Sequence, residues 1–257
     1  MKTDRRLVRA LQAIISIGVL AGAWQIASLF FPPFLFPSIP AIVTRTMEIF
    51  LSRPLLLDVL VTAGRIFAGL AGAFVLGGAI AMLMARSQSF ENYTNPILVF
   101  FQGIPALSWV VIAIIWFHGI EFRIFFIMVM TTLPAFTFQI LDALRSMSKD
   151  LFEMTMSFRP RRSTLFRVLI LPTIIPGILT AWKVNLGNAA RVVVVAELVG
   201  ATGGVGYELL RQQQLFDMAG AIAWTLQLVL FVLIVQQTIV GIESVMLRYR
   251  AVSERAM

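Results

Sequence analysis

Long apolar runs constrain this chain most strongly. A transmembrane helix needs about 20 predominantly apolar residues, because each residue adds about 1.5 Å and the hydrocarbon core is about 30 Å thick. Runs of this kind occupy about residues 7–31, 60–84, 96–117, 122–144, 172–198 and 218–245. In lipid every backbone polar group must be satisfied internally. The pattern therefore predicts an all-α integral membrane protein, with six transmembrane helices in a single transmembrane domain over residues 1–257.

The composition agrees with a membrane protein. The chain is 59% apolar and only 13% charged, against about 25% charged residues in soluble domains. It contains no cysteine, which excludes disulfides and thiolate metal sites. The first apolar run is longer than the core of a signal peptide and has no small-residue cleavage site. We therefore expect it to remain as the first span.

The distribution of cations predicts the orientation. The net charge of +8 could indicate a nucleic-acid partner, but the positive-inside rule is the simpler explanation. With six spans and both termini on the cytoplasmic side, fourteen Lys and Arg residues fall inside and four outside. We therefore expect cytoplasmic termini, attraction to anionic membrane lipid and no nucleic-acid partner.

Small residues on the second span predict close helix packing. Four of them recur at intervals of four residues, which makes one face of the helix nearly flat. They are Gly69, Ala73, Gly77 and Ala81. This span therefore belongs inside a helix bundle.

The longest polar interval, residues 145–171, is strongly basic and has helical order. Apolar residues recur within and just before it at spacings of three and four, which predicts one apolar face on a short helix. These residues are Leu144, Met147, Leu151, Met154 and Phe158. The segment should lie on the cytoplasmic side, along the membrane or against a partner protein.

This interval resembles the EAA-loop signature of ABC importer permeases. The matching residues are Glu153, Met154 and Thr155, then Arg159 six positions after Glu153, then Ile170-Leu171-Pro172. The resemblance implies a cytoplasmic coupling helix that docks in a groove of an ATPase subunit. It assigns ATPase coupling to Glu153, Met154, Thr155, Phe158, Arg159, Arg161 and Arg162. Anchoring of the arginines to lipid headgroups is the alternative.

One departure from the signature concerns the turn after the coupling helix. The family has glycine where this chain has Arg159, and glycine takes positive φ at little cost. Pro160 follows and cannot continue a helix. We therefore expect Arg159-Pro160 to turn differently from the family.

Other segments extend the resemblance over nearly the whole chain. Residues 36–40, Phe-Pro-Ser-Ile-Pro, and the pair Ala196-Glu197 before a glycine-rich connector are similar to permeases for sulfonates, taurine, nitrate or bicarbonate. The resemblance implies the type I importer permease (MetI-like) fold in the bacterial inner membrane. It also implies a homodimer, two ATPase subunits that carry ATP and Mg²⁺, and a periplasmic or lipid-anchored substrate-binding protein. This chain would be a transport subunit without catalytic residues, metal or cofactor of its own.

Polar residues inside the spans give candidates for a translocation path. A charge near the bilayer centre costs about 2.5–3.5 kcal/mol, so it should face protein or water. The fifth span carries two cations and two amides on adjacent rows, and Gly103 and Pro105 loosen the third span beside further polar residues. The candidate path residues are Gln102, Ser108, Trp109, Lys183, Asn185, Asn188, Arg191 and Glu197. The alternative is that Lys183 and Arg191 pair with Glu197, Glu121 or backbone carbonyls to lock the bundle.

Two other functions compete with the importer hypothesis. A stand-alone secondary carrier or channel would use Lys183, Arg191 and Glu197, but it predicts repeated halves, and no convincing repeat is present. A membrane scaffold would not need polar residues in mid-membrane. The sequence thus favours the permease of an ATP-driven importer for a small anionic solute.

Overall fold

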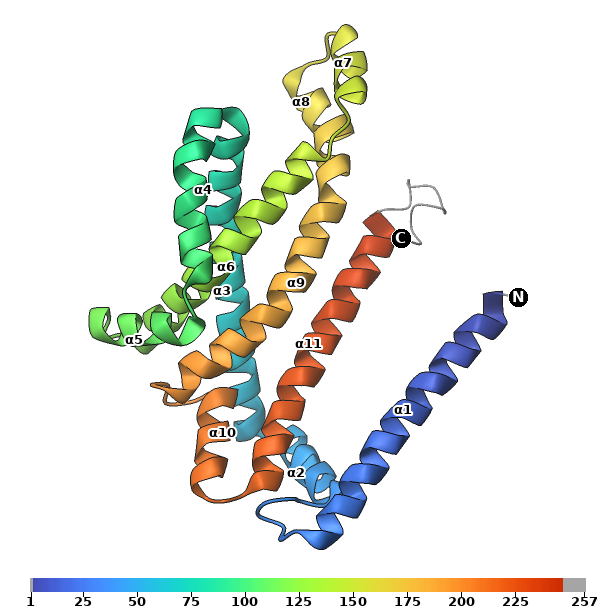
Figure 1. Ribbon diagram of the computed structural model, residues 1–257, viewed down its shortest axis with the longest axis vertical. Helices are drawn as coiled ribbons and strands as arrows, with labels where there is room; N and C mark the ends of the chain where they lie inside the picture. Colours follow the sequence, from blue (N-terminus) through green and yellow to red (C-terminus); the bar gives the residue numbers. More distant parts are fainter. Residues whose placement is uncertain (1, 247–257) are drawn as a thin grey trace.

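A computed structural model describes residues 2–246, and every regular element in that range is helical. In chain order the elements are α1 (Lys2–Phe30), α2 (Ile39–Leu51), α3 (Arg53–Arg86), α4 (Gln88–Gly103), α5 (Ala106–Trp116), α6 (Ile120–Arg145), α7 (Lys149–Ser157), α8 (Arg162–Leu165), the π-helical turn η1 (Phe166–Ile170), α9 (Leu171–Leu198), α10 (Val205–Gln214) and α11 (Met218–Met246). The molecule is elongated, with α7 at one end and α10 at the other (Figure 1).

Helices α3, α6 and α9 form the centre of the bundle, with α6 packed between the other two. The four small residues of α3 are buried as predicted: Gly69, Ala73, Gly77 and Ala81. A Cβ atom on Gly77 would lie 3.0 Å from the carbonyl oxygen of Leu133 on α6. The flat face of α3 therefore brings the two helix backbones together, and the prediction is confirmed.

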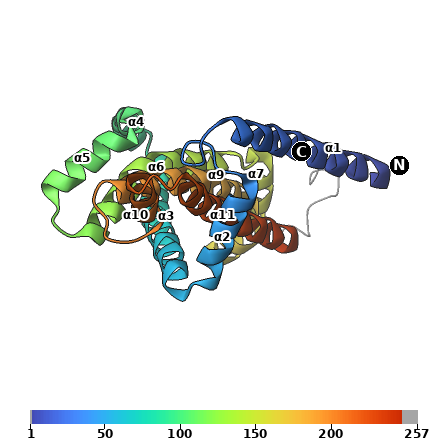
Figure 2. The same ribbon diagram turned by 90° about the horizontal axis from the view of Figure 1, so that it is seen from below.

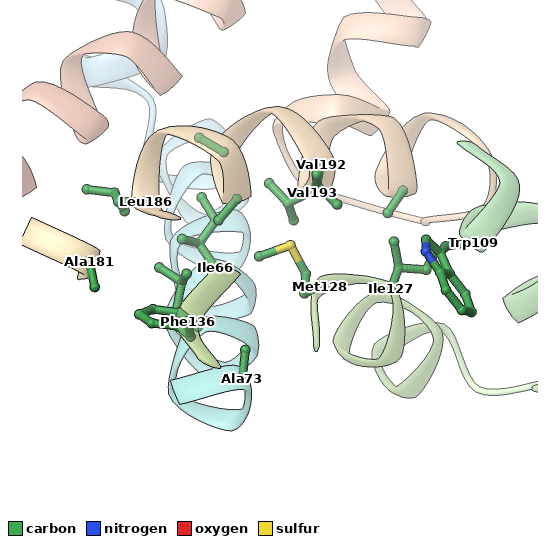
Figure 3. Close-up of a cluster of buried hydrophobic side chains, with 14 of the residues drawn as sticks. Ile66, Ala73, Trp109, Ile127, Met128, Phe136, Ala181, Leu186, Val192 and Val193 are labelled. Carbon is green, nitrogen blue, oxygen red and sulfur yellow. The ribbon is translucent and has the colours of Figure 1, made fainter. Parts of the chain in front are cut away.

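The side chains between these helices form one continuous apolar core. Met128 and Phe136 of α6 meet Ile66 of α3 and Val193 of α9, and all four are fully buried (Figure 3). Phe136 also packs edge-on against Trp182 of α9, with ring centroids 5.7 Å apart. This core fixes the three helices on which most of the candidate site residues lie.

The predicted third span, 96–117, is not a straight helix. Helix α4 starts earlier, at Gln88, with Ser87 as its N-cap, and ends at Gly103. The chain then turns through 96° into α5. Pro105 precedes α5 and has no backbone N–H to continue the hydrogen-bond ladder. The bend falls between Gly103 and Pro105, the two residues that were expected to loosen this span.

Length and composition support four or five of the six predicted spans among the described residues. In residues 2–246, four helical stretches are long and apolar enough to cross a membrane, and a fifth exists if α4 and α5 count as one bent span. The four are α3, α6, the stretch Ser163–Leu198 that ends with α9, and α11. The apolar described part of α1, Ile14–Phe30, is shorter than these.

Helix α1 lies away from the bundle along most of its length (Figures 1 and 2). Two hydrogen bonds hold its end: Trp24 Nε1 donates to the Pro37 carbonyl at 3.0 Å, and Gln25 Oε1 accepts from the Ile39 N–H at 2.9 Å. The Gln25 side chain thus satisfies the first turn of α2. Large apolar side chains such as Leu20 remain exposed within this chain.

Candidate functional site

The basic interval forms a short helix at one end of the molecule. Helix α6 ends at Arg145, and α7 begins at Lys149 after a break. The Ser148 hydroxyl accepts from the Leu151 N–H at 3.5 Å and caps α7. The expected apolar face is therefore interrupted, because Leu144 lies in α6 and Met147 lies in the break. The α7 part of that face is made by Leu151, Met154 and the C-cap residue Phe158.

The apolar face of α7 is uncovered by the rest of the described chain. Leu151, Met154 and Phe158 are 49%, 57% and 79% exposed. Glu153 is exposed on the same helix, whereas Thr155 is half-buried and its hydroxyl donates to the Leu151 carbonyl at 2.7 Å. Uncovered apolar side chains of this size on a nine-residue helix indicate a surface that binds a partner or the membrane.

Arg159 has a left-handed backbone, with φ +47. Its N–H donates to the Met156 carbonyl at 2.9 Å, which closes the last turn of α7. The chain thus makes the positive-φ turn for which the signature uses glycine, and the expectation of a different turn was wrong. Arg161 is exposed just beyond this turn, and α8 starts at Arg162, whose side chain is not among those described.

The predicted polar stripe of α9 divides into two groups. Lys183 Nζ donates to Glu243 Oε2 of α11 at 2.6 Å, and Asn185 Nδ2 donates to Gln139 Oε1 of α6 at 2.6 Å. These two residues tie α9 to its neighbours. This agrees with the alternative that Lys183 locks the bundle, but its partner is Glu243 and not Glu197 or Glu121.

The second group of the stripe, Asn188 and Arg191, has no polar contacts within the described chain. Asn188 and Arg191 are exposed, and neither forms a hydrogen bond or ion pair with any residue in the described range 2–246. They share one face of α9 with the exposed residues Thr180 and Val184. A polar and cationic stripe is thus left uncovered on a helix that is long enough to span the membrane.

The candidates near the bend of α4 and α5 also separate. Gln102 and Ser108 are exposed on either side of the bend. Trp109 is 4% exposed, and its Nε1 has no hydrogen-bond partner among the described residues. Its ring packs edge-on between Phe101 and Phe126, at centroid distances of 5.7 and 6.0 Å. Trp109 is therefore part of an aromatic cluster that holds α5 against α6.

A buried ionic network at the opposite end from α7 contains the last candidate, Glu197. Arg65 of α3 donates from Nη1 to Glu197 Oε1 of α9 at 2.7 Å. The same guanidinium binds Glu121 of α6 through both carboxylate oxygens, at 2.5 and 3.0 Å. The Thr62 hydroxyl lies 2.9 and 3.0 Å from the two oxygens of Glu197. Glu197 is 1% exposed, so the structure places it in a structural network instead of on an open surface.

The same network holds the glycine-rich connector between α9 and α10. The Gly204 N–H donates to Asp58 Oδ1, the Val205 N–H to Thr62 Oγ1 and the Gly206 N–H to Glu197 Oε2, each at 2.8 Å. Gly204 has φ +111, and a Cβ there would lie 2.5 Å from Glu197 Oε1. Only glycine can occupy this position.

Sequence reasoning missed the role of Arg65. The signal was present, because Asp58, Thr62 and Arg65 recur at spacings of four and three on one face of α3. The Arg65 partners Glu121 and Glu197 are 56 and 132 residues away along the chain. Periodicity does not show which acid a buried arginine binds.

Comparisons with known proteins agree on one family. A family model described as "Binding-protein-dependent transport system inner membrane component" matches residues 73–244. The formylaminopyrimidine transport permease protein ThiX of Halalkalibacterium halodurans is 29% identical over 249 residues, 96% of this chain and 98% of the relative. The taurine transport system permease protein TauC of Escherichia coli is 24% identical over 206 residues, 76% and 75% of the two chains.

A solved structure shares the fold. A crystal structure of the MetNI methionine ABC transporter, described as inward facing, superposes with a TM-score of 0.66 at 19% identity. The match covers 76% of this chain and 99% of the other. At this identity the likeness shows the helical architecture only.

Proposed function

The chain belongs to the family of binding-protein-dependent transport system inner membrane components, which are multi-pass inner-membrane permeases of ABC transporters, and from this premise we propose that it forms the translocation path of an importer for a small anionic solute. Permeases of this class work with ATPase and substrate-binding subunits, and they are transport subunits. In this chain the path would open and close by alternating access, with ATP and Mg²⁺ bound on the partner ATPase.

The uncovered face of α7 carries the proposal at the cytoplasmic end. Leu151, Met154 and Phe158 offer apolar anchors, and Glu153 and Arg161 offer charges at the rim, which is the usual anatomy of a protein interface. Helix α11 ends on the α7 side of the bundle, and α1 starts on that side (Figure 1). This arrangement supports six spans with both termini on the cytoplasmic side, where the basic residues gather.

Arg191 supports the path and its charge preference. An unpaired arginine facing lipid would cost about 2.5–3.5 kcal/mol, so this face of α9 needs protein or water against it. A second copy of this chain would cover it and enclose a water-filled path between two equivalent α9 stripes. Asn188 and Arg191 would then attract a small anion, with Gln102 and Ser108 as further polar lining.

The structure sharpens this set of path residues. Lys183 and Asn185 already bind α11 and α6, and Glu197 is enclosed by Arg65 and Thr62. The rival secondary carrier needed Lys183, Arg191 and Glu197 as one coupled site. Two of these three are committed to different partners, so that alternative is not favoured.

The docking proposal is tested by copurification with the ATPase. Wild-type permease should retain the ATPase. A variant carrying Glu153→Ala with Arg161→Glu and Arg162→Glu should lose it while keeping its own elution volume and melting temperature. The matched control is Arg86→Glu, which changes an exposed cation in the last turn of α3. Equal retention by all three proteins would show that α7 is not the dock.

The anion proposal is tested by uptake into vesicles that contain the whole importer. Taurine, which carries a sulfonate, and a formylaminopyrimidine, which carries no acid group, are the two radiolabelled probes, because the relatives TauC and ThiX are named for these solutes; uptake of the pyrimidine alone would contradict the anion preference. We expect Arg191→Gln to lower uptake of the transported probe about tenfold or more, and Asn188→Ala to lower it less. Unchanged uptake by Arg191→Gln, with normal ATPase binding, would remove Arg191 from the path.

A further inference from the structure

Helix α9 connects the two ends of the molecule. It begins directly after the coupling segment α7–η1 and continues without interruption to Leu198, at the connector to α10. Its 28 residues span about 42 Å. A movement that enters at α7 can therefore reach the opposite end along one helix, provided that the far end of α9 is firmly attached to its neighbours.

We propose that Arg65, through Glu197, is the positioning residue of a permanent clamp, defined here as Asp58, Thr62, Arg65, Glu197 and the connector 199–206. The clamp fastens the far end of α9, the connector and the start of α10 to α3. It makes them one rigid unit, so that displacement of α9 at the coupling end is carried to α10. The inference rests on the proposed importer function for its role in transport, but the clamp itself is a property of this chain alone.

The polar groups of the clamp satisfy one another. Glu197 accepts from Arg65, Thr62 and the Gly206 N–H, and its side chain has 0% exposure. Arg65 Nη1 also donates to the Gly203 carbonyl at 2.8 Å, so a single nitrogen holds both α9 and the connector. Opening these contacts would leave a buried charge without a partner, which is a large cost. The clamp should therefore stay closed throughout the cycle.

The other carboxylate on Arg65 has a different environment. The Glu121 side chain is 70% exposed and lies at a groove of about 590 Å³ that Val61, Ala68 and Phe125 also line. The Arg65 side chain is only 8% exposed, but it lines the same groove, so water there can accept from its Nε and Nη2 when Glu121 moves away. Arg65 thus has one permanent partner and one exchangeable partner. Helix α6 can move at Glu121 while the clamp remains intact.

Hydrogen exchange of the connector amides tests the clamp directly. The N–H groups of Gly204, Val205 and Gly206 are themselves donors within it, so a peptide covering 199–207 reports its opening. The sample is the full chain in nanodiscs, without any partner. We expect Arg65→Gln to raise exchange of this peptide at least about tenfold, and Glu121→Gln to change it by less than about twofold.

Two further variants separate a clamp from general loosening. Arg123→Gln is the matched control, because Arg123 lies beside Gly200 but forms no ion pair with the described residues.

The rescue variant adds Asp58→Cys and Gly203→Cys to Arg65→Gln. The chain has no other cysteine, and a Cβ on Gly203 would lie 3.0 Å from Asp58 Oδ1. Oxidation should restore slow exchange in the connector, and reduction should remove it.

The same measurement with the ATPase bound tests permanence. Adding ATP and vanadate should change exchange in α7 and leave the 199–207 peptide unchanged. The clamp proposal is overturned if the 199–207 peptide of Arg65→Gln exchanges as slowly as that of the wild type, or if Glu121→Gln speeds its exchange as much as Arg65→Gln does. It is also overturned if ATP speeds exchange of this peptide. Failure of the importer function would appear separately, as no effect of the ATPase on α7 in the wild-type protein.

Discussion

The two ends of this molecule handle polar and apolar groups in opposite ways. At the end that carries the connector, Arg65 and Glu197 are buried and each has several partners within the chain. At the α7 end, Phe158 is 79% exposed, and Leu151 and Met154 are about half exposed. The buried polar groups at the connector end are satisfied within the chain, whereas the apolar face of α7 is left uncovered by the described residues.

This difference separates stability from function along the length of the bundle. Changes at the connector end should act mainly on folding, because they leave buried groups without partners. Changes on α7 should act mainly on binding, because the side chains there contact little else. The following measurements test this contrast, in order of decreasing change in free energy.

Arg65→Gln should destabilise the protein by about 3–5 kcal/mol, because it leaves the buried carboxylate of Glu197 without its cation. Unfolding in detergent, followed by circular dichroism, measures this free energy. Glu121→Gln should cost less than about 1 kcal/mol, because the Glu121 side chain is 70% exposed. Similar losses for both variants would contradict the division of Arg65 between a permanent and an exchangeable partner.

Phe158→Ala should weaken ATPase binding by about 2 kcal/mol, or roughly thirtyfold in Kd, if this ring is a central anchor of the dock. Its stability should match that of the wild-type protein. Biolayer interferometry with immobilised permease gives the affinity. Tyr93→Ala, which removes another exposed aromatic ring, on α4, is the control and should bind normally. A destabilised Phe158→Ala protein with normal affinity would reverse the contrast.

Lys183→Gln should lower the unfolding free energy by about 1 kcal/mol, because it removes the hydrogen bond to Glu243 from a pair that is 27% exposed on both sides. A double-mutant cycle with Glu243→Gln isolates the coupling between the two residues. Uptake of a transported solute should change less than in Arg191→Gln. A larger loss of uptake in Lys183→Gln would return Lys183 to the path.

Arg159→Gly should give the smallest change, a stabilisation of α7 by about 0.5–1 kcal/mol, because glycine takes positive φ without a Cβ penalty. Hydrogen exchange in residues 149–157 would slow accordingly. Arg159→Val is the opposite variant and should speed exchange, since a β-branched residue tolerates this conformation poorly. Equal exchange in all three proteins would mean that the turn does not limit the stability of α7.

Local patterns in the sequence predicted the elements that depend on nearby residues. The small residues from Gly69 to Ala81 predicted the buried face of α3, because helix periodicity alone decides which residues share a face. The spacing of Leu151, Met154 and Phe158 predicted the apolar face of α7. Glu153 and the residues after it predicted a family relationship that the matched family model confirms.

Features that depend on distant partners could not be predicted in this way. Gly103 and Pro105 marked a weak point in the third span, but the 96° bend depends on how α5 packs against α6 and α9. Lys183 was recognised as a buried cation, yet Glu243 was not recognised as its partner. The left-handed turn at Arg159 was missed because intrinsic preference argues against it, and the hydrogen bond to Met156 overrides that preference.

The clamp also constrains the biosynthesis of the protein. Arg65 enters the membrane with α3, but its permanent partner Glu197 is 132 residues further along the chain. At about 5–20 residues per second, the ribosome needs on the order of ten seconds to supply it. During that interval the arginine must be kept hydrated or shielded by the insertion machinery, since a free charge in lipid is costly. The connector end of α3 therefore becomes fixed only after α9 and the connector have been made.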